Sequence, residues 1–191
     1  MRCYIYLFRH GATRDNEKGV FSGWRDVGLT AKGFRDAKIV ALRLKNKKFD
    51  IAFETRLKRS KQTLKEVLKF HPECKRVSVD DRMIERNYGK LQGKTHLEIV
   101  QKYGWKKYDL WHRGYENKPP EGESIKDVEK RVLSFVKWLL KLIKEEKINV
   151  AISAHGNSMR PFRRYYEKLS ILEMCKLYND YEAVYEYSVD V

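Results

Sequence analysis

Short apolar runs alternate with amphipathic stretches along the first part of the chain, and this alternation constrains the fold more than any other feature. Residues 3–8, 49–53 and 77–79 have the length and composition of buried strands. Between them, residues 31–47 and 57–70 place apolar side chains at helical spacing. A strand–helix–strand–helix–strand order predicts a mostly parallel sheet. We therefore expect an α/β fold of three layers, with helices on both faces of the sheet.

The same alternation continues in the last third of the chain. Ser124 is a helix N-cap residue, and an amphipathic pattern follows it to about residue 147. Residues 148–154 are β-branched and small apolar residues, which predicts a fourth strand. We expect helices over 158–168 and from Ser170. An alternating pattern over 182–189 then predicts a last strand at an edge of the sheet.

Residues 84–123 are the least regular part of the sequence. We expect a helical and loop insertion at about 94–123 that lies over the carboxyl ends of the strands. The rest of the pattern runs through the 191 residues without a repeat or a linker, so we expect one domain over 1–191. Hydrophobic residues make up 42% and charged residues 35%, which is typical of a globular protein.

The apolar runs indicate a protein without a membrane-spanning segment. Each is shorter than the roughly 20 residues that a spanning helix needs. The first run is interrupted by Arg9 and His10, which argues against a signal peptide. Cys3, Cys74 and Cys175 follow no disulfide or metal-binding spacing. We expect a cytoplasmic protein with isolated thiols.

The charge balance is strongly basic, with 41 Lys and Arg against 26 Asp and Glu and a net charge of +15. Such a balance suits nucleic acid, an acidic surface or a small anionic substrate. Many of the lysines fall on expected helix faces, at 45–48 and 141–147, where a solvated surface is the simpler interpretation. A basic nucleic-acid-binding module stays an alternative, but no aromatic-interleaved motif of a known nucleic-acid reader is present.

The first strand ends in Arg9-His10-Gly11, a combination with specific chemistry. A neutral imidazole is a nucleophile at physiological pH. A guanidinium matches the oxygens of a phosphate, and a glycine lets the backbone approach a ligand closely. Taken alone, the tripeptide is also what a strand end with a solvated Arg-His pair looks like. Its interpretation depends on which other residues lie near the carboxyl end of this strand.

The fourth strand also ends in His-Gly, at His155-Gly156. Parallel strands end at one edge of a sheet, where ligands bind in open α/β folds. Arg59 follows the second strand and Glu85 follows the third, so we expect both at this edge as well. One nucleophile, several cations and one carboxylate together predict a site that handles phosphate.

With these residues in view, the chain resembles the histidine phosphatase superfamily, and within it the cofactor-dependent phosphoglycerate mutases. The resemblance covers nearly the whole chain. The segments that carry it are Arg9 to Asn16, Phe21-Ser22-Gly23-Trp24 with Asp26, Leu57 to Thr63, Glu85 to Gly93, and His155-Gly156-Asn157-Ser158-Met159-Arg160.

The resemblance implies a role for each residue at the expected edge. His10 is the implied phosphoryl acceptor, and Arg9, Arg59 and His155 are implied to surround the transferring group. Glu85 is the implied general acid and base. The implied substrate-binding residues are Asn16, Ser22, Gly23, Tyr88, His112, Arg113, Gly156 and Asn157.

One implied contact is altered in this chain. The mutases present a pair of arginines where this sequence has His112 and Arg113, so one contact to the substrate is weakened or made dependent on pH. The family also places a lysine near His96. Lys94 is two residues earlier, and the sequence does not decide which of the two reaches the substrate carboxylate.

The resemblance implies the interconversion of 3-phosphoglycerate and 2-phosphoglycerate, a step of glycolysis and gluconeogenesis, through a phosphohistidine at His10. 2,3-Bisphosphoglycerate is the implied phosphoryl primer. No metal is expected, because no ligand cluster is apparent in the sequence. A phosphomonoester hydrolase that uses the same residues is the alternative, favoured by the compact segment 119–124. The expected partner is a small phosphorylated anion, and a homo-oligomer is left open.

Overall fold

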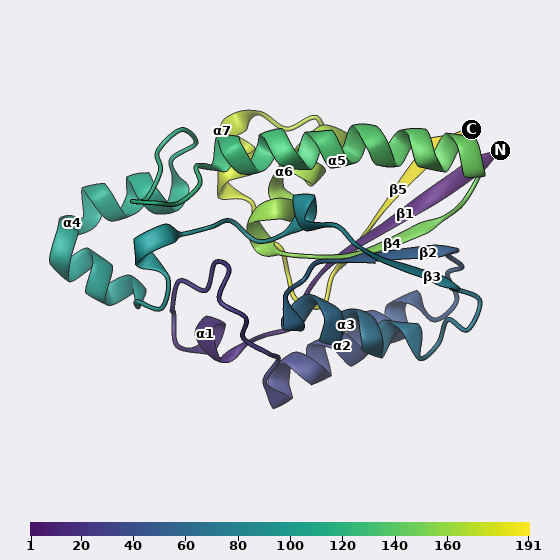
Figure 1. Ribbon diagram of the computed structural model, residues 1–191, viewed down its shortest axis with the longest axis horizontal. Coiled ribbons are helices and arrows are strands. Elements are labelled where there is room, and N and C mark those ends of the chain that lie inside the picture. Colours follow the sequence, from purple (N-terminus) through teal and green to yellow (C-terminus); the bar gives the residue numbers. More distant parts are fainter.

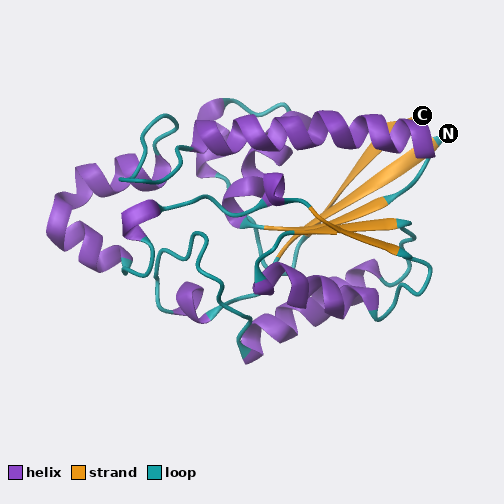
Figure 2. Cartoon of the chain, in the orientation of Figure 1, coloured by secondary structure: helices purple, strands orange, loops and turns teal.

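The computed structural model describes residues 1–191, and a five-stranded, mostly parallel sheet forms its centre, as predicted (Figures 1 and 2). The strands follow the order β3-β2-β4-β1-β5, and β5 at one edge is antiparallel to β1. Their bounds are β1 (Arg2–Arg9), β2 (Ile51–Glu54), β3 (Arg76–Val79), β4 (Val150–Ala154) and β5 (Val184–Asp190).

Helices cover both faces of this sheet, so the expected three layers are present (Figure 1). On one face lie α2 (Ala31–Leu44) and α3 (Lys58–Leu68), and on the other lie α5 (Ile125–Glu146) and α6 (Gly156–Glu167). Alternate residues of β1 face opposite layers, since side chains on a strand point to the two faces in turn. Ile5 and Leu7 pack with α5, while Tyr6 and Phe8 pack with α2 and α3.

Side-chain caps explain where several helices begin. The Thr30 hydroxyl accepts a hydrogen bond from the Gly33 amide at the start of α2, and Ser124 forms a capping box with Asp127 at the start of α5. Such caps stabilise a helix by about 1 kcal/mol each. Both helices therefore start where the sequence predicts. Helix α2 ends earlier than predicted, at Leu44, whereas α5 ends at Glu146, as predicted.

Helix α6 begins two residues earlier than predicted, at Gly156. The extended backbone of His155 serves as its N-cap, and the His155 amide donates to the Ser158 hydroxyl at 3.3 Å. Gly156 and Asn157 therefore belong to the first turn of a helix, where backbone amides have no partner within the helix.

The segment 84–123 contains more regular structure than its sequence suggests. It holds the 3₁₀ turn η2 (Gly89–Leu91) and an 18-residue helix, α4 (His96–Arg113), which is kinked at Gly104 where φ is +78°. A capping box between Thr95 and Glu98 begins this helix. Figure 1 shows α4 beyond the carboxyl ends of the parallel strands. The short elements α1 (Arg14–Glu17), η1 (Asp81–Met83) and α7 (Ile171–Lys176) complete the chain.

None of the helices combines the length and the apolar character that crossing a membrane requires.

Candidate functional site

Strands β1 and β4 end side by side and deliver two histidines to one place. Arg9 is paired with Ala154 in the sheet, and the His10 amide donates to the Ala154 carbonyl at 3.0 Å. The next residues, His10 and His155, leave the sheet together with their ring centroids 5.0 Å apart. They are 2% and 0% exposed. The predicted convergence of the two His-Gly segments is therefore confirmed.

The contacts of His10 set its protonation state. Its Nδ1 lies 2.7 Å from the Gly11 carbonyl oxygen, and since that oxygen can only accept, Nδ1 carries the hydrogen. Burial and the charges of Arg59 and Arg9 hold the pKa of His10 well below its usual value. The ring is therefore neutral near pH 7, and Nε2 presents a lone pair. This is the state that a nucleophilic histidine needs.

His155 is held by a neighbouring hydroxyl. Its Nε2 lies 2.8 Å from Thr55 Oγ1, which also accepts from the Leu57 amide at 3.4 Å. The Thr55 hydroxyl can thus donate its hydrogen to Nε2, which leaves the hydrogen of His155 on Nδ1. That Nδ1 is buried without a partner, so it offers a hydrogen bond to a bound group. Burial and the nearby Arg59 hold the pKa of His155 well below its usual value.

Glu85 is fixed by the start of α6. Its Oε1 accepts from the amides of Arg86 at 2.7 Å and Asn157 at 3.1 Å. The second amide belongs to the first turn of α6, where the partial positive charge of the helix favours a carboxylate. Oε2 accepts no hydrogen bond within the protein and is available to a bound group.

Arg59 reaches the site from the first turn of α3. Its side chain is 1% exposed, and its Nη1 and Nη2 donate to the carbonyls of Arg25 at 2.8 Å and Gly23 at 2.7 Å. Gly23 has φ +52°, a backbone conformation that favours glycine, in the turn that holds Arg59. No carboxylate forms a salt bridge with this guanidinium.

Arg9 is held from the other side by the segment that follows α7. Its Nη1 donates to the Asn179 carbonyl at 2.9 Å, and its guanidinium lies 4.0 Å from the ring centroid of Tyr181. Its Nε is buried without a partner. Arg9 therefore keeps donors for an anion.

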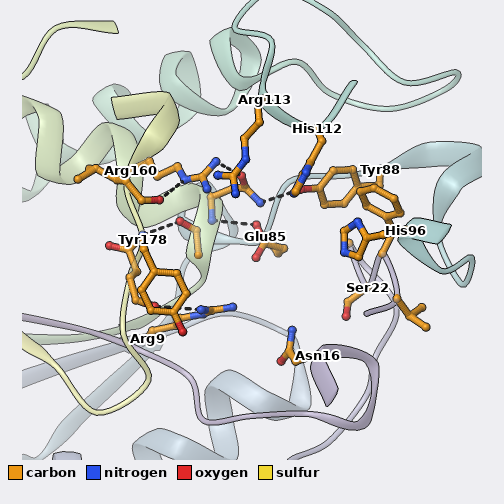
Figure 3. A pocket seen from close by; sticks show the side chains of 17 residues that line it. Arg9, Asn16, Ser22, Glu85, Tyr88, His96, His112, Arg113, Arg160 and Tyr178 are labelled. Carbon is orange, nitrogen blue, oxygen red and sulfur yellow. Dashed lines mark hydrogen bonds between the residues drawn. The ribbon is translucent and has the colours of Figure 1, made fainter. Parts of the chain in front are cut away.

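These groups border a cavity of about 200 Å³ (Figure 3). Every substrate-binding residue that the resemblance implies lies in its wall, together with Arg9 and Glu85. His10, Arg59 and His155 are buried next to it. The full lining is Arg9, Asn16, Val20, Phe21, Ser22, Gly23, Glu85, Tyr88, His96, His112, Arg113, Gly156, Asn157, Arg160, Leu177, Tyr178 and Asn179.

Several lining residues were not assigned from the sequence. Arg160 stands three residues after Asn157 on α6, within the quoted motif, and helical spacing could have indicated it. Residues 177–179 follow α7 without any sequence signal of function. Of the two residues left open near position 96, His96 lies in the cavity wall and Lys94 is exposed outside it.

The environment of His112 does not agree with the expectation that its contact with the substrate could depend on pH. Burial and the charge of Arg113 lower the pKa of His112 to about 3. His112 is therefore neutral near pH 7, and a pH-dependent contact at this position is not supported. The charge at this end of the cavity comes from its neighbours instead.

The structure brings together three residues of a kind that can bind metals, which the sequence spacing did not indicate. One ligand atom each from His10, Glu85 and His155 lies within 4.8 Å of the others. Arg9 and Arg59 lower the pKa of the His10 ring by their charge, and the same charge opposes a metal cation. The buried donors without partners instead suit the oxygens of a phosphoryl group.

Comparison with known proteins agrees with this geometry. The chain is 36% identical over 166 residues to the 2,3-bisphosphoglycerate-dependent phosphoglycerate mutase of Cytophaga hutchinsonii, which covers 87% of this chain and 78% of the relative. It is 38% identical over 161 residues to a phosphoglycerate mutase of Schizosaccharomyces pombe, which covers 82% and 75%. Among solved structures, Bacillus stearothermophilus YhfR aligns with a TM-score of 0.86 and 26% identity over 98% of this chain and 92% of its own.

A family model covers nearly the whole chain. The model of the histidine phosphatase superfamily (branch 1) matches residues 5–190, which confirms the resemblance seen in the motifs. The chain belongs to branch 1 of the histidine phosphatase superfamily.

Proposed function

We propose that this protein is a phosphoglycerate mutase that interconverts 3-phosphoglycerate and 2-phosphoglycerate through a phosphohistidine at His10. The observation that carries the proposal is the placement of arginines without carboxylate partners at two ends of one cavity, with Glu85 between them (Figure 3). Arg9 lies beside the two histidines and Arg113 lies at the other end. Such a cavity suits a substrate with two anionic groups and a hydroxyl between them.

The buried polar atoms without partners fit a phosphoryl group at the histidine end. They include Arg9 Nε, Ser22 Oγ and His155 Nδ1. Burying a polar atom without a hydrogen-bond partner costs free energy. A phosphate oxygen that forms a hydrogen bond with each of these atoms would remove that cost. The Gly156 amide at the start of α6 adds the positive end of a helix. A bisphosphoglycerate that primes His10 fits the same donors.

In the proposed transfer, His10 gives and takes the phosphoryl group. A substrate hydroxyl forms the new O–P bond as the N–P bond to His10 Nε2 breaks, and Glu85 takes the hydroxyl proton. In the second transfer, Nε2 forms an N–P bond to the other phosphoryl group of the bisphosphorylated intermediate. The O–P bond of that group breaks, and Glu85 returns the proton to the oxygen that leaves. Arg9, Arg59 and His155 hold the phosphoryl oxygens throughout.

The remaining wall residues bind and orient the substrate in this proposal. They are Asn16, Ser22, Gly23, Tyr88, Asn157 and, at the far end, His112 and Arg113. We further propose that residues 1–191 act as one catalytic domain in which 94–123 covers the cavity. Three wall residues of that segment, His96, His112 and Arg113, support this role.

A phosphomonoester hydrolase is the second candidate, in which water replaces the substrate hydroxyl. The compact segment 119–124 favours it, because short phosphatases of the superfamily share this form. The backbone of Gly89 packs directly against Pro120 and Gly122. Segment 119–124 therefore closes the turn that carries Tyr88.

The deciding experiment measures isomerisation of 3-phosphoglycerate and hydrolysis of phosphomonoesters in parallel, with and without 2,3-bisphosphoglycerate. A mutase isomerises faster than it hydrolyses and depends on the primer. Hydrolysis that exceeds isomerisation and ignores the primer would assign the protein as a phosphatase. Salt-dependent binding of nucleic acid without either activity would favour the nucleic-acid-binding alternative.

A further inference from the structure

The far end of the cavity contains a second arginine that belongs to a motif of the resemblance but has no implied role there. Arg160 on α6 is 9% exposed and lies in the cavity wall with Arg113, which comes from the end of α4. Figure 3 shows both side chains on the side of Glu85 opposite Arg9 and Asn16. Two separate elements thus bring two guanidinium groups to one end of the cavity.

The hydrogen bonds of these two arginines leave donors free. Arg160 Nε donates to the Leu177 carbonyl at 3.1 Å and Nη1 donates to Asn157 Oδ1 at 3.1 Å, which leaves Nη2 without a partner in the protein. Arg113 makes one long contact, from Nη1 to the Cys175 carbonyl at 3.4 Å. Neither arginine forms a salt bridge with a carboxylate, so both can bind an anionic group of a ligand.

Arg113 and Arg160 shift the pKa of a different histidine from the one that Arg9 and Arg59 affect. Arg59 and Arg9 lower the pKa of His10, whereas Arg113 and Arg160 are among the charges that lower the pKa of His112. Burial and, to a smaller extent, the charge of Arg113 lower the pKa of Arg160, and both guanidinium groups border the same cavity. An anion between them would interact favourably with both charges.

We propose that Arg160 is a specificity-determining residue that forms, together with Arg113, the subsite for the second anionic group of the substrate. This proposal rests on the proposed function for the identity of that group, a carboxylate. It also explains how the chain tolerates a histidine at position 112. The neutral His112 cannot supply the charge of an arginine there, and Arg160 supplies it from α6.

Arg160 is also connected to the carboxylate that handles the proton. Asn157 accepts from Arg160 through Oδ1, donates to the Tyr88 hydroxyl through Nδ2 at 3.1 Å, and donates to Glu85 through its amide. A substrate anion that binds Arg160 therefore contacts a residue that also positions Glu85. The subsite couples recognition of the second anion to the orientation of the proton-transfer group.

The test compares binding of two small phosphate esters by calorimetry to the dephosphorylated protein. 3-Phosphoglycerate carries a carboxylate, whereas glycerol 3-phosphate has a hydroxymethyl group in its place. The ratio of their dissociation constants measures recognition of the second anion and needs no turnover. In Arg160→Met and in Arg113→Met, we expect this ratio to fall by about 10- to 100-fold, as loss of a charged hydrogen bond predicts. Binding of glycerol 3-phosphate should change less than about 3-fold.

Two further variants serve as controls. Lys176→Gln removes one positive charge from an exposed position next to Leu177, outside the cavity wall, and should leave the ratio unchanged. Arg160→Lys keeps the charge but loses the planar fork, so its ratio should lie between those of the wild type and Arg160→Met. This variant tests the proposal even where the methionine variant does not fold.

The outcomes separate this proposal from the proposed function. Equal losses of both ligands in Arg160→Met, or an unchanged ratio, would overturn the role of Arg160. A ratio that depends on Arg160 in a protein that does not isomerise phosphoglycerate would support the subsite and refute the mutase. Isomerisation that survives Arg160→Met with an unchanged ratio would support the mutase and refute the subsite.

Discussion

His10 and His155 are neighbours because Arg9 and Ala154, the residues before them, are paired across two parallel strands. The sheet register therefore places the two rings with centroids 5.0 Å apart. Each ring is neutral, and each uses one nitrogen for a contact within the protein, His10 to Gly11 and His155 to Thr55. The free nitrogen of His10 is left for attack and that of His155 for donation. This difference in contacts gives two identical side chains different proposed roles.

The first prediction concerns the nucleophile. His10→Ala should abolish the acid-labile phosphoryl label that 2,3-bisphosphoglycerate leaves on the protein, because the lone pair of the neighbouring neutral imidazole, on His155 Nε2, is engaged by the Thr55 hydroxyl. Rapid quench followed by acid treatment measures the label. His71→Ala is the matched control, since His71 is a buried histidine that contacts Glu73 far from the cavity wall. Label that persists in His10→Ala would refute the assignment.

The second prediction concerns the pH dependence of labelling. An imidazole with an unperturbed pKa near 6.5 loses about three-quarters of its neutral form by pH 6. The pKa of His10 is held well below that value by burial and by Arg59 and Arg9, so its neutral form should persist. The rate of phosphohistidine formation at saturating donor should therefore change little between pH 8 and pH 6. A fall of several-fold over this range, with an apparent pKa near 6.5, would contradict the buried, neutral state.

The same pKa shifts predict how stability depends on pH. The pKa of His112 is about 3 in the folded protein and near 6.5 when the chain is unfolded. Between these values the unfolded chain binds more protons, so the free energy of unfolding should fall as the pH drops below about 6.5. Each histidine with such a lowered pKa reduces the free energy of unfolding by at most about 1.4 kcal/mol per pH unit. Chemical unfolding at pH 7 and pH 5 should show a smaller loss in His112→Gln than in the wild type, and an equal loss would argue against the shift.

Sequence patterns were sufficient for the sheet and for the phosphoryl end of the site. The alternation of apolar runs predicted the parallel strands, and strand ends placed Arg9, His10, Arg59, Glu85 and His155 at one edge. These predictions depend on local periodicity and on a general property of parallel sheets, so they need no knowledge of side-chain contacts.

The far end of the site could not be predicted in the same way. Arg160 faces the cavity because α6 begins at Gly156 rather than at Ser158, a boundary set by the extended backbone of His155. Asn179 reaches Arg9 because α7 ends at Lys176 and the chain then crosses the site. Helical spacing from Asn157 could have indicated Arg160, but only once the helix boundary was known, and the tertiary contacts of Asn179 leave no periodic signal in the sequence.

The fourth prediction separates proton transfer from charge stabilisation. In Glu85→Gln the side-chain oxygen still accepts from the amides of Arg86 and Asn157, so the shape of the site and ligand binding should be retained. Transfer between His10 and a hydroxyl should slow by about 10² to 10⁴-fold. Arg59→Ala should instead weaken ligand binding and also slow transfer by about 10²-fold or more. Calorimetry and single-turnover labelling measure the two effects, and equal losses of affinity in both variants would contradict these roles.

The last prediction concerns Asn179, which connects three parts of the site. Its carbonyl accepts from Arg9 Nη1, its Nδ2 donates to the Gly156 carbonyl at 2.8 Å, and its Oδ1 accepts from Arg163 at 3.0 Å. The side chain is 2% exposed, so its loss in Asn179→Ala removes buried hydrogen bonds and should cost about 1–3 kcal/mol of stability. Because these bonds hold the backbone that orients Arg9, formation of phosphohistidine should slow by about 10-fold with every phosphoryl donor.

Asp180→Asn is the matched control for this variant, because Asp180 is the exposed neighbour and contacts only the Glu182 amide. It should label at the wild-type rate. Asn179→Ala should also leave the preference for 3-phosphoglycerate over glycerol 3-phosphate unchanged, because Asn179 acts on Arg9 at the phosphoryl end and not on Arg160. A slower rate for one donor only, or a lost preference for the carboxylate, would place the action of Asn179 at the far end of the cavity. Wild-type labelling in Asn179→Ala would show that Arg9 is oriented without it.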